Sequence, residues 1–252
     1  EVLLIGRTTS ASKPLDTRPY LTHRMHLPFE RGPLFYASFN VVLFFHLLFR
    51  KSEILFSNDL DTLLPNFLVA RLKRKHLIYD SHEYFTEVPE LVSRPKVQAI
   101  WRSIERRILP KLTFALTVNA SIAELYKKAY GIDMKVLRNM PKPLDKASKT
   151  RKELGLPEDK KIVILQGSGI NMHRGSEEAV EAMRYINNAV LLIIGSGDVL
   201  DILKRNVKDF GIEDKVIFKG RMPYAKMMAH TQLADLGLTL DKDTNINYRY
   251  SL

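Results

Sequence analysis

The chain contains no cysteine. It therefore has no disulfide bond, no thiolate metal site and no cysteine nucleophile, and its composition fits a reducing compartment. It also lacks an apolar run of the roughly 18 residues that a membrane-spanning helix needs. The longest such run, FNVVLFFHLLF at 39–49, is interrupted by His46. No secretion signal is visible, so we expect a cytoplasmic protein.

Acidic residues are too few to balance the basic ones, and the net charge is +11. Residues 1–146 hold 23 Lys and Arg against 14 Asp and Glu, a net of +9, whereas residues 147–252 hold 16 against 14, a net of +2. The first half is therefore expected to meet an anionic partner: a nucleic acid, an anionic membrane or a phosphorylated substrate. No nucleic-acid-binding motif is present, and the aromatic residues lie in apolar runs rather than among basic ones, so we expect no nucleic-acid partner.

Short apolar runs alternate with helical patterns along the chain. Strands are expected at 2–6, 53–57, 76–80, 113–118, 134–138, 161–166, 189–194, 215–219 and 235–240. Helices are expected at about 34–50, 61–74, 95–110 and 120–130, and after the first three strands of the second half. The strands lack polar alternation, which is typical of strands buried on both faces. Repeated strand–helix–strand units predict parallel sheets with right-handed crossovers.

The segment NMPKPLDKASKT at 139–150 interrupts this alternation with two prolines and no periodicity, as an interdomain linker does. The sequence therefore predicts two Rossmann-like, doubly wound α/β domains, residues 1–145 and 146–252, that face each other across a cleft. In such folds ligands bind beyond the carboxyl ends of the strands.

Polar residues follow the strands of the first domain. Asp59 and Ser81 could cap the helices that follow them, Asp61 could equally do so, and for Asn119 and Ser121 capping is the favoured interpretation. His82 and Glu83 fit that interpretation less well because no clean helical pattern begins there. A histidine beside carboxylates is a plausible site group, since its pKa is easily tuned near neutrality.

Glycines follow the strands of the second domain. Gly167 and Gly169 allow close approach of a ligand to the backbone. Arg174 lies just before Ser176, a predicted helix N-cap, and an arginine near a helix N-terminus suits a diphosphate. Further glycine turns begin at Gly195 and Gly220. None of these loops completes a Walker loop or a dinucleotide fingerprint.

Five stretches, in this order, resemble the family 4 glycosyltransferases, which are retaining, nucleotide-sugar-dependent enzymes of the GT-B fold. They are YDSHEYFTEVPEL, TVNASIAELYKKAYG with KVLRN, ILQGSGINMHRGSEEAVEAM, LLIIGSGD and VIFKGRMPYAKMMAHTQLADLGL. The resemblance covers nearly the whole chain. It implies a nucleoside-diphosphate sugar as donor and no cofactor or metal.

The resemblance also implies roles for individual residues. Arg174 and Gly175 would hold the donor diphosphate. The remaining donor-side residues would be Gly167, Ser168, Gly169, Gly195, Ser196, Gly197, Gly220, Arg221 and Met222. Ser168 stands where the family often has a basic residue. His82 and Glu83 would serve catalysis, and Asp59 and Asn139 would lie on the acceptor side.

Two features of the family pattern are missing from the sequence. Family members begin with a strand and a glycine loop, whereas nothing precedes EVLLIGR. They also carry a Glu–seven residues–Glu segment, and this chain stops at NYRYSL, where that segment would begin. We therefore expect both ends to belong to a longer protein.

The expected activity is transfer of a sugar to an acceptor hydroxyl with retention of the anomeric configuration, in the synthesis of a surface polysaccharide or glycolipid. The acceptor would be a sugar or a lipid-linked sugar. The apolar segment 34–51, which ends in Arg50 and Lys51, together with the basic first half, suggests peripheral contact with the inner face of an anionic membrane, although a buried core helix is the simpler interpretation. A sugar-nucleotide epimerase of the same fold and a basic nucleic-acid-binding protein remain the alternatives.

Overall fold

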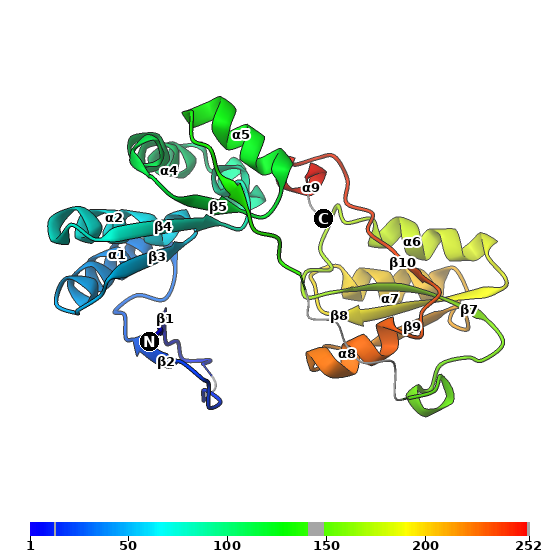
Figure 1. Cartoon of the computed structure of the whole chain (residues 1–252). Coiled ribbons are helices and arrows are strands. Elements are labelled where there is room, and N and C mark those ends of the chain that lie inside the picture. The colour runs from blue at the N-terminus through cyan, green and yellow to red at the C-terminus, as the bar shows by residue number, and fades with distance from the viewer. Residues whose placement is uncertain (13, 141–148, 251–252) are drawn as a thin grey trace. The chain divides into compact units, whose positions relative to one another are not determined.

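The computed structural model describes residues 1–12, 14–140 and 149–250. The chain divides into two units, Glu1–Asn139 and Met140–Leu252, called unit 1 and unit 2 below (Figure 1). The predicted domain boundary at 145/146 and most of the predicted linker lie outside the described residues.

Unit 1 is built on a parallel sheet of order β3-β4-β5-β6. Its strands are β3 (Ile54–Asn58), β4 (His76–Ser81), β5 (Ala115–Thr117) and β6 (Lys135–Val136). The helices between them are α2 (Leu60–Lys73), α3 (Pro89–Val92), α4 (Pro95–Ile108) and α5 (Ala120–Tyr130), with 3₁₀ turns η1 (Phe85–Glu87) and η2 (Leu109–Lys111) around α3 and α4. The four predicted strands and three predicted helices of this region are therefore present, and the strands after β4 are shorter than predicted.

A second, two-stranded parallel sheet begins the chain. It pairs β1 (Leu3–Arg7) with β2 (Leu21–Met25), in register from Leu3–Leu21 to Arg7–Met25. The sequence predicted β1 but not β2, because LTHRM has neither an apolar run nor strict alternation. The strand predicted at 2–6 is thus correct, and it pairs outside the four-stranded sheet.

Helix α1 (Gly32–Leu48) buries a stripe that repeats every four residues: Phe35, Phe39, Leu43 and Leu47. This spacing keeps the four side chains on one face, as expected of a helix packed on a core. The face is buried mainly against α2, whose Leu60, Leu63 and Val69 are fully buried. The interpretation of α1 as a core helix is correct for this face, and its opposite face is exposed.

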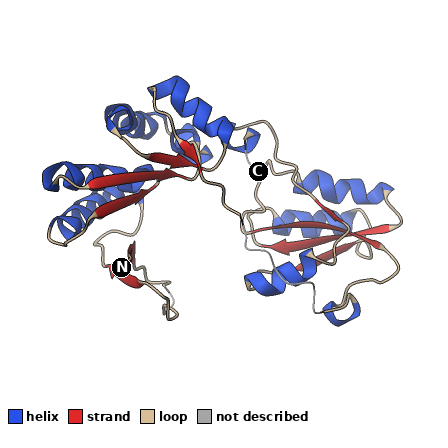
Figure 2. Cartoon of the chain, in the orientation of Figure 1, coloured by secondary structure: helices blue, strands red, loops and turns tan. Residues whose placement is uncertain are grey.

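Unit 2 contains a parallel sheet of order β10-β7-β8-β9. Its strands are β7 (Lys161–Gly167), β8 (Ala189–Gly195), β9 (Val216–Lys219) and β10 (Leu236–Gly237). The other elements are η3 (Lys152–Leu154), α6 (Ser176–Ala182), η4 (Met183–Tyr185), α7 (Leu200–Asp209), α8 (Tyr224–Thr231) and α9 (Ile246–Arg249). Figure 2 shows helices on both faces of this sheet.

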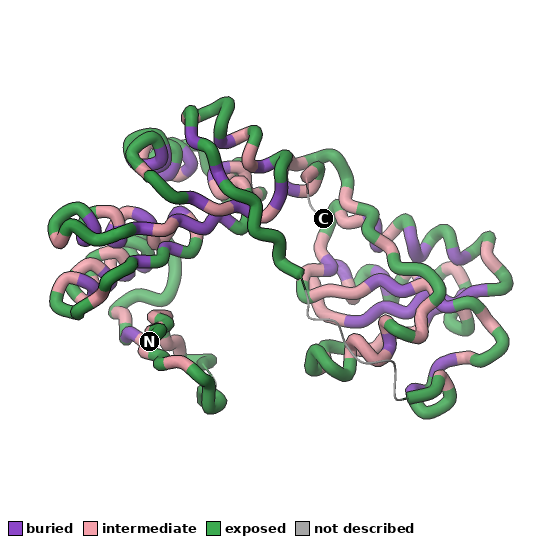
Figure 3. The backbone as a smooth tube through the Cα atoms, in the orientation of Figure 1, coloured by how far each residue is buried: buried purple, intermediate pink, exposed green. Residues whose placement is uncertain are grey.

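The sequence of strand β8 explains why both faces of the unit 2 sheet are covered by other elements. Leu191 and Ile193 pack on one side with residues of α6 and α7. Leu192 and Ile194 pack on the other side, against side chains from η3 and α8. Alternate side chains of a strand point to opposite faces, so an unbroken apolar run requires cover on both. The strand is buried along nearly its whole length (Figure 3), and the doubly wound prediction is confirmed.

Candidate functional site

At the carboxyl end of the unit 1 sheet, His82 lies between two carboxylates. Its Nδ1 is 3.1 Å from Asp59 Oδ2 and its Nε2 is 3.3 Å from Asp80 Oδ2. The backbone N–H of His82 donates to Asp59 Oδ1 at 2.9 Å. Because β3 and β4 are neighbouring parallel strands, with Asn58 opposite Asp80, the residues that follow them meet at one edge. The sequence therefore correctly predicted that Asp59 and His82 gather there.

The two carboxylates determine the charge of the imidazole. Burial lowers the pKa of His82, the carboxylates of Asp59 and Asp80 raise it, and the net effect is a raised pKa. Only the imidazolium form donates from both ring nitrogens. When it is protonated, His82 engages both donors with carboxylates, an arrangement that suits orienting and charge balance better than accepting a proton.

Asp59 does not act as the helix cap that the sequence allowed. It occupies the N-cap position of α2 with φ 57°, yet its side chain makes no capping hydrogen bond. Its carboxylate serves His82 instead. A non-glycine residue in the left-handed region costs about 1–3 kcal/mol and persists where the surroundings fix it, often at functional sites. Asn119 does cap α5, accepting from Ile122 N–H at 2.9 Å as expected.

The other unit 1 candidates are placed less closely. Glu83 is exposed, and its backbone carbonyl accepts from Ser81 Oγ at 2.6 Å, while that hydroxyl also lies 2.9 Å from the hydroxyl of Tyr126. The Ser81 hydroxyl therefore hydrogen-bonds both to the loop that follows β4 and to the buried Tyr126. Asn139 is exposed beyond β6. The roles predicted for Glu83 and Asn139 stay predictions.

Sequence reasoning missed a buried carboxyl behind this loop, that of Glu105 on α4. The side chain is fully buried; Tyr130 donates to its Oε2 at 2.5 Å and Thr86 does so at 3.3 Å, while Oε1 has no hydrogen-bond partner among the described residues. Burial raises the pKa of Glu105 to about 7, against the lowering effect of these hydrogen bonds. A glutamate in an amphipathic helix carries no signal of burial, so the sequence could not identify it.

In unit 2, the first two glycine loops touch through their backbones. Gly167 and Gly195 are paired in register, and the N–H of Ser196 donates to the Gly167 carbonyl at 3.2 Å. The N–H of Ile170 donates to the Ser196 carbonyl at 3.0 Å. A Cβ at Gly195 would overlap the Gly167 carbonyl, and one at Gly197 would overlap Ile170. These two glycines are therefore required by the close packing of the two loops.

Gly167 and Gly169 differ from that pair. A Cβ at either position would meet nothing closer than 3.8 Å and 3.6 Å, respectively. The neighbouring Ser168 is exposed. This part of the loop therefore leaves room beside the backbone, as contact with a ligand requires.

Arg174 lies at the turn before α6. Its Nη1 is 3.6 Å from Asp241 Oδ1, its guanidinium carbon is 4.8 Å from the centre of the Tyr248 ring, and its buried Nε has no hydrogen-bond partner among the described residues. The predicted N-cap is wrong: Gly175 occupies that position with φ 70°, and Ser176 is a buried first helical residue whose hydroxyl donates to Glu177.

The third loop, which follows β9, offers the least support for a ligand site. Gly220 and Arg221 are exposed, and a Cβ at Gly220 would meet nothing within 4 Å. Met222 packs against the core layer that contains Leu192, so part of its role is structural. In unit 2, Arg174 contacts Asp241 and Tyr248, which the sequence did not single out.

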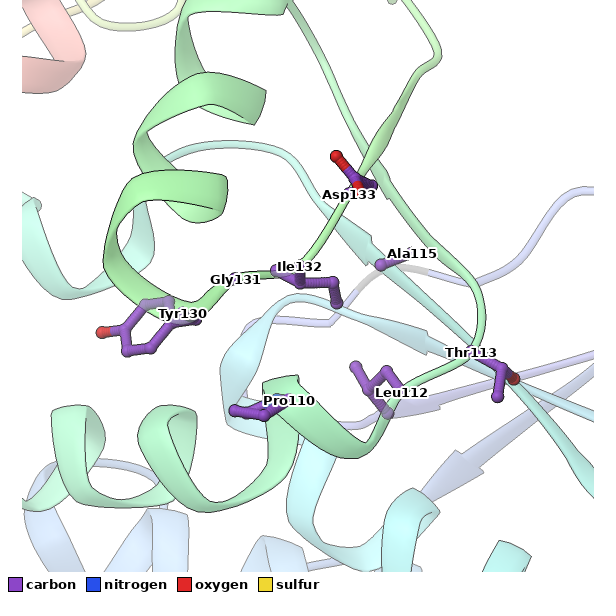
Figure 4. A pocket seen from close by; sticks show the side chains of 8 residues that line it. All are labelled: Pro110, Leu112, Thr113, Ala115, Tyr130, Gly131, Ile132 and Asp133. Atoms are coloured by element: carbon purple, nitrogen blue, oxygen red, sulfur yellow. The ribbon is translucent and has the colours of Figure 1, made fainter.

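Two pockets of about 300 and 370 Å³ are lined by none of the site residues predicted from the sequence. The first is at the amino end of β5 and is lined by Pro110, Leu112, Thr113, Ala115, Tyr130, Gly131, Ile132 and Asp133 (Figure 4). The second is lined by Arg151, Glu158, Asp159, Lys160, Lys161 and Asn188, at the amino ends of β7 and β8. Within the described ranges no group of three His, Asp or Glu side chains is spaced to hold a metal ion.

Comparison with known proteins gives a family match for unit 2. Residues 146–240 match the sequence model of the family described as glycosyl transferases group 1. The match contains all the glycine loops and Arg174. A comparison with curated proteins found no match.

Solved structures resemble the chain over most of its length. Sucrose-phosphate synthase from Thermosynechococcus elongatus is 18% identical with a TM-score of 0.68, over 94% of this chain and 64% of that one. Anabaena HepE in complex with UDP is 15% identical with a TM-score of 0.63, over 86% and 60%. The lipopolysaccharide outer core galactosyltransferase WaaB is 14% identical with a TM-score of 0.58, over 94% and 73%.

These likenesses establish the fold, which is that of the GT-B glycosyltransferases. The chain spans less than two thirds of the length of the first two of these proteins.

Proposed function

The chain has the GT-B fold and carries a glycosyl transferases group 1 domain at residues 146–240, and from this premise we propose that it transfers a sugar from a nucleoside-diphosphate sugar to an acceptor hydroxyl. The observation that carries the proposal is that the residues matched by this family include both an open glycine loop, at Gly167 and Gly169, and Arg174, whose terminal donors are exposed. The anomeric configuration is retained in the proposed reaction.

Arg174 is the proposed diphosphate ligand. At 3.6 Å its contact with Asp241 is an ion pair beyond hydrogen-bond distance, and its Nε is unpartnered among the described residues. A guanidinium has five N–H donors in a planar fork that fits phosphate oxygens. Because Nε is buried, the exposed terminal N–H groups of the guanidinium are the donors that a diphosphate would use. HepE was solved with UDP and the Staphylococcus aureus protein TarM with UDP and α-GlcNAc-glycerol, so UDP is the first nucleotide to test.

The proposed step breaks the bond between the sugar C1 and the diphosphate oxygen, and forms a bond from C1 to the acceptor oxygen on the same face. The acceptor proton leaves with the diphosphate. Arg174 stabilises the charge that develops on the leaving group, and the loops hold the reactants in position. We propose that no metal takes part, and unchanged transfer in EDTA would support this.

We propose that His82 and Asp59 belong to the part of the site that binds the acceptor. Because both ring nitrogens already face carboxylates, the imidazolium would fix the orientation of Asp59 and Asp80, whose oxygens can accept hydrogen bonds from sugar hydroxyls. Glu83 is proposed as a second catalytic residue and Asn139 as a further acceptor contact. A route through a covalent intermediate on Glu83 or Asp59 is the less economical variant, because the Asp59 carboxylate is already engaged with the backbone and ring of His82.

Transfer of radiolabelled sugar tests the proposal. UDP-, GDP- and ADP-sugars are incubated with the full protein and a glycolipid extract, and labelled product is separated from donor. Labelled product supports transfer. Conversion of the donor sugar without an acceptor would show an epimerase instead, and salt-sensitive retention of labelled RNA or DNA, with no product, would show a nucleic-acid-binding protein.

We further propose that the acceptor is lipid-linked and that unit 1 reaches it at the inner face of an anionic membrane. The exposed face of α1 carries Leu34, Val41 and Phe45, and the stacked Phe49 follows with 81% of its surface exposed. Lys73 of α2 donates to carbonyls at the end of α1, so the two helix ends are adjacent. Among the described residues, no helix has the length and apolar character needed to cross a bilayer.

We call this region the α1–α2 end surface. It consists of exposed apolar and basic side chains: Phe45, Phe49, Leu72, Arg50, Lys51, Arg71, Arg74 and Lys75. Apolar insertion together with basic residues is the usual requirement for peripheral attachment to anionic lipid. One structural neighbour, WaaB, acts on the lipopolysaccharide outer core, which suggests a surface glycolipid as the class of product.

Liposome flotation tests this surface. Binding should require anionic lipid and weaken as salt rises. Replacing both Phe45 and Phe49 by Ser should weaken binding at least about tenfold, since each buried phenylalanine side chain contributes over 1 kcal/mol. Ile100→Ser, at an exposed apolar site on α4, is the matched control. If the control behaves like the double variant, the surface is assigned wrongly.

A further inference from the structure

The chain after β10 folds back over the turn that carries Arg174. Leu240 packs so closely on Gly175 that a Cβ at that glycine would overlap it, and the N–H of Lys242 donates to the His173 carbonyl at 2.9 Å. Lys242 also forms an ion pair with Glu178 on α6. Residues 240–242 are therefore fixed to the turn by backbone contacts on both sides of Arg174, and the segment 240–249 continues from them.

The turn itself is conformationally demanding. His173 has φ 68° and Gly175 has φ 70°, so both residues that flank Arg174 are left-handed. A non-glycine residue such as His173 adopts this region at a cost of about 1–3 kcal/mol. The turn thus directs the Arg174 side chain away from the path of an ordinary helix start, toward the segment 240–249.

Two side chains of that segment contact the guanidinium of Arg174. Asp241, whose side chain is only 10% exposed, lies 3.6 Å from Nη1, and the ring of Tyr248 lies 4.8 Å from the guanidinium carbon. The carboxylate fixes the direction of the charge, and the ring supports the guanidinium by a cation–π contact. The Arg174 side chain remains 41% exposed, so its other donors stay available.

We propose that Asp241 and Tyr248 are positioning residues that hold Arg174 ready for the donor diphosphate. The inference rests on the proposed function, since it assigns Arg174 to the diphosphate. Restricting a flexible arginine before the ligand arrives lowers the entropic cost of binding. An ion pair of 3.6 Å suits this role because it orients the side chain without occupying its hydrogen-bond donors.

A double-mutant cycle separates this role from a merely structural one. If Asp241 acts through Arg174, its effect on nucleotide affinity disappears once Arg174 is gone. The probe is the nucleoside diphosphate among UDP, GDP and ADP that binds the wild-type protein, measured by titration calorimetry. Asp241→Asn should weaken its binding about fivefold, the scale of a partly exposed charge pair, and should have no further effect in the Arg174→Ala background.

Tyr248 has an internal control. Tyr248→Phe keeps the ring and should bind as wild type does, whereas Tyr248→Leu should bind about threefold more weakly. Asp243→Asn tests a carboxylate of the same segment that pairs with Arg249 rather than Arg174 and should leave affinity unchanged. In transfer assays the Asp241 and Tyr248→Leu variants should raise the KM for the donor more than they lower kcat.

Three results would overturn the proposal. Equal losses from Asp241→Asn with and without Arg174 would show a structural role. Tighter binding by Asp241→Asn would show that Asp241 competes with the diphosphate. A wild-type protein that binds no nucleoside diphosphate would contradict the proposed function itself. In that case, the cycle repeated on urea unfolding without nucleotide still reports whether the two side chains are coupled.

Discussion

At the carboxyl edge of unit 1 the loops are held by side chains, whereas in unit 2 the backbones of neighbouring loops are in direct contact. In unit 1 the imidazole of His82 connects Asp59 with Asp80, across the ends of β3 and β4. In unit 2 Gly195 lies against the carbonyl of Gly167, with no space for a side chain between them. The two edges occupy equivalent places in similar folds.

This difference predicts different sensitivities. The unit 1 edge depends on ionisable groups, so pH should change it. The unit 2 edge depends on the absence of Cβ atoms. Its stability should therefore change little with pH and should fall sharply when a glycine is replaced by alanine. The side chain that we expect to bind a ligand at this edge is Arg174, most of whose N–H donors make no hydrogen bond within the described residues.

The largest effect is expected from Gly195→Ala. The added Cβ would overlap the Gly167 carbonyl, and Gly195 has φ 139°, which side chains rarely adopt. Overpacking against backbone together with strain should cost about 3 kcal/mol or more in the free energy of unfolding of unit 2, measured with urea. Gly220→Ala, where a Cβ meets nothing within 4 Å, should change it by less than about 0.5 kcal/mol. Similar values for the two variants would remove close packing as the explanation.

The next effect concerns pH and unit 1. The folded pKa of Glu105 is about 7 and its ordinary value is 4.5. Between these values the folded state holds a proton that the unfolded state has lost. The free energy of unfolding should therefore fall as pH rises from 4.5 through 7, by up to about 3 kcal/mol.

Glu105→Gln should remove the share of this dependence that comes from Glu105, because the amide stays neutral and can still accept from Tyr130. Urea unfolding at pH 5 and pH 8 measures the slope for the wild type, for this variant and for Glu124→Gln, an exposed carboxyl on α5 that serves as control. A Glu105→Gln variant with the wild-type slope would show that the buried carboxyl is not the source. Asp61, whose pKa burial raises to about 6, contributes in the same direction.

Arg174→Ala should weaken nucleoside-diphosphate binding by about 1.5–3 kcal/mol, the contribution of charge-assisted hydrogen bonds. Titration calorimetry measures the change. Arg205→Ala, which removes an exposed arginine from α7, should leave affinity unchanged. An unchanged affinity in Arg174→Ala would place the diphosphate elsewhere.

His82→Ala should lower the rate of sugar transfer at least about tenfold, because loss of the imidazole would misplace the carboxylates that contact the acceptor. It should cost only about 1 kcal/mol of stability, since the pair is partly exposed. That stabilisation is complete below pH 6.5 and is lost as pH rises through the raised folded pKa of His82. His76→Ala, at the exposed start of β4, is the control. Normal turnover combined with a large loss of stability would assign His82 to structure alone.

The sequence predicted the elements whose apolar pattern decides their structure. Strands β7 and β8 and helix α5 were placed within a residue, and Gly131 ends α5 in the left-handed conformation expected of a helix C-terminus. Strand β2 was missed because LTHRM is held by pairing with β1 rather than by its own pattern. A pairing partner that is distant in sequence leaves no local signal.

The candidate site was predicted where chain order and strand register are enough to bring residues together. Asp59 and His82 follow adjacent strands, so the carboxyl-edge rule placed them correctly. The same rule applied to β10 would have suggested Asp241. The rule cannot show that the Asp59 side chain binds His82 instead of capping α2. It also cannot show that Gly175 rather than Ser176 is the N-cap residue of α6, or that Glu105 is buried. Each of these features depends on tertiary contacts.

The measurement that tests the account most directly compares nucleoside diphosphates with the matching monophosphates. Titration calorimetry of the full protein with UDP and UMP, GDP and GMP, and ADP and AMP isolates the contribution of the second phosphate. The account predicts that for one base the diphosphate binds at least about tenfold more tightly, because Arg174 engages it with charge-assisted hydrogen bonds. Equal affinities within every pair, or no binding of any diphosphate, would contradict it.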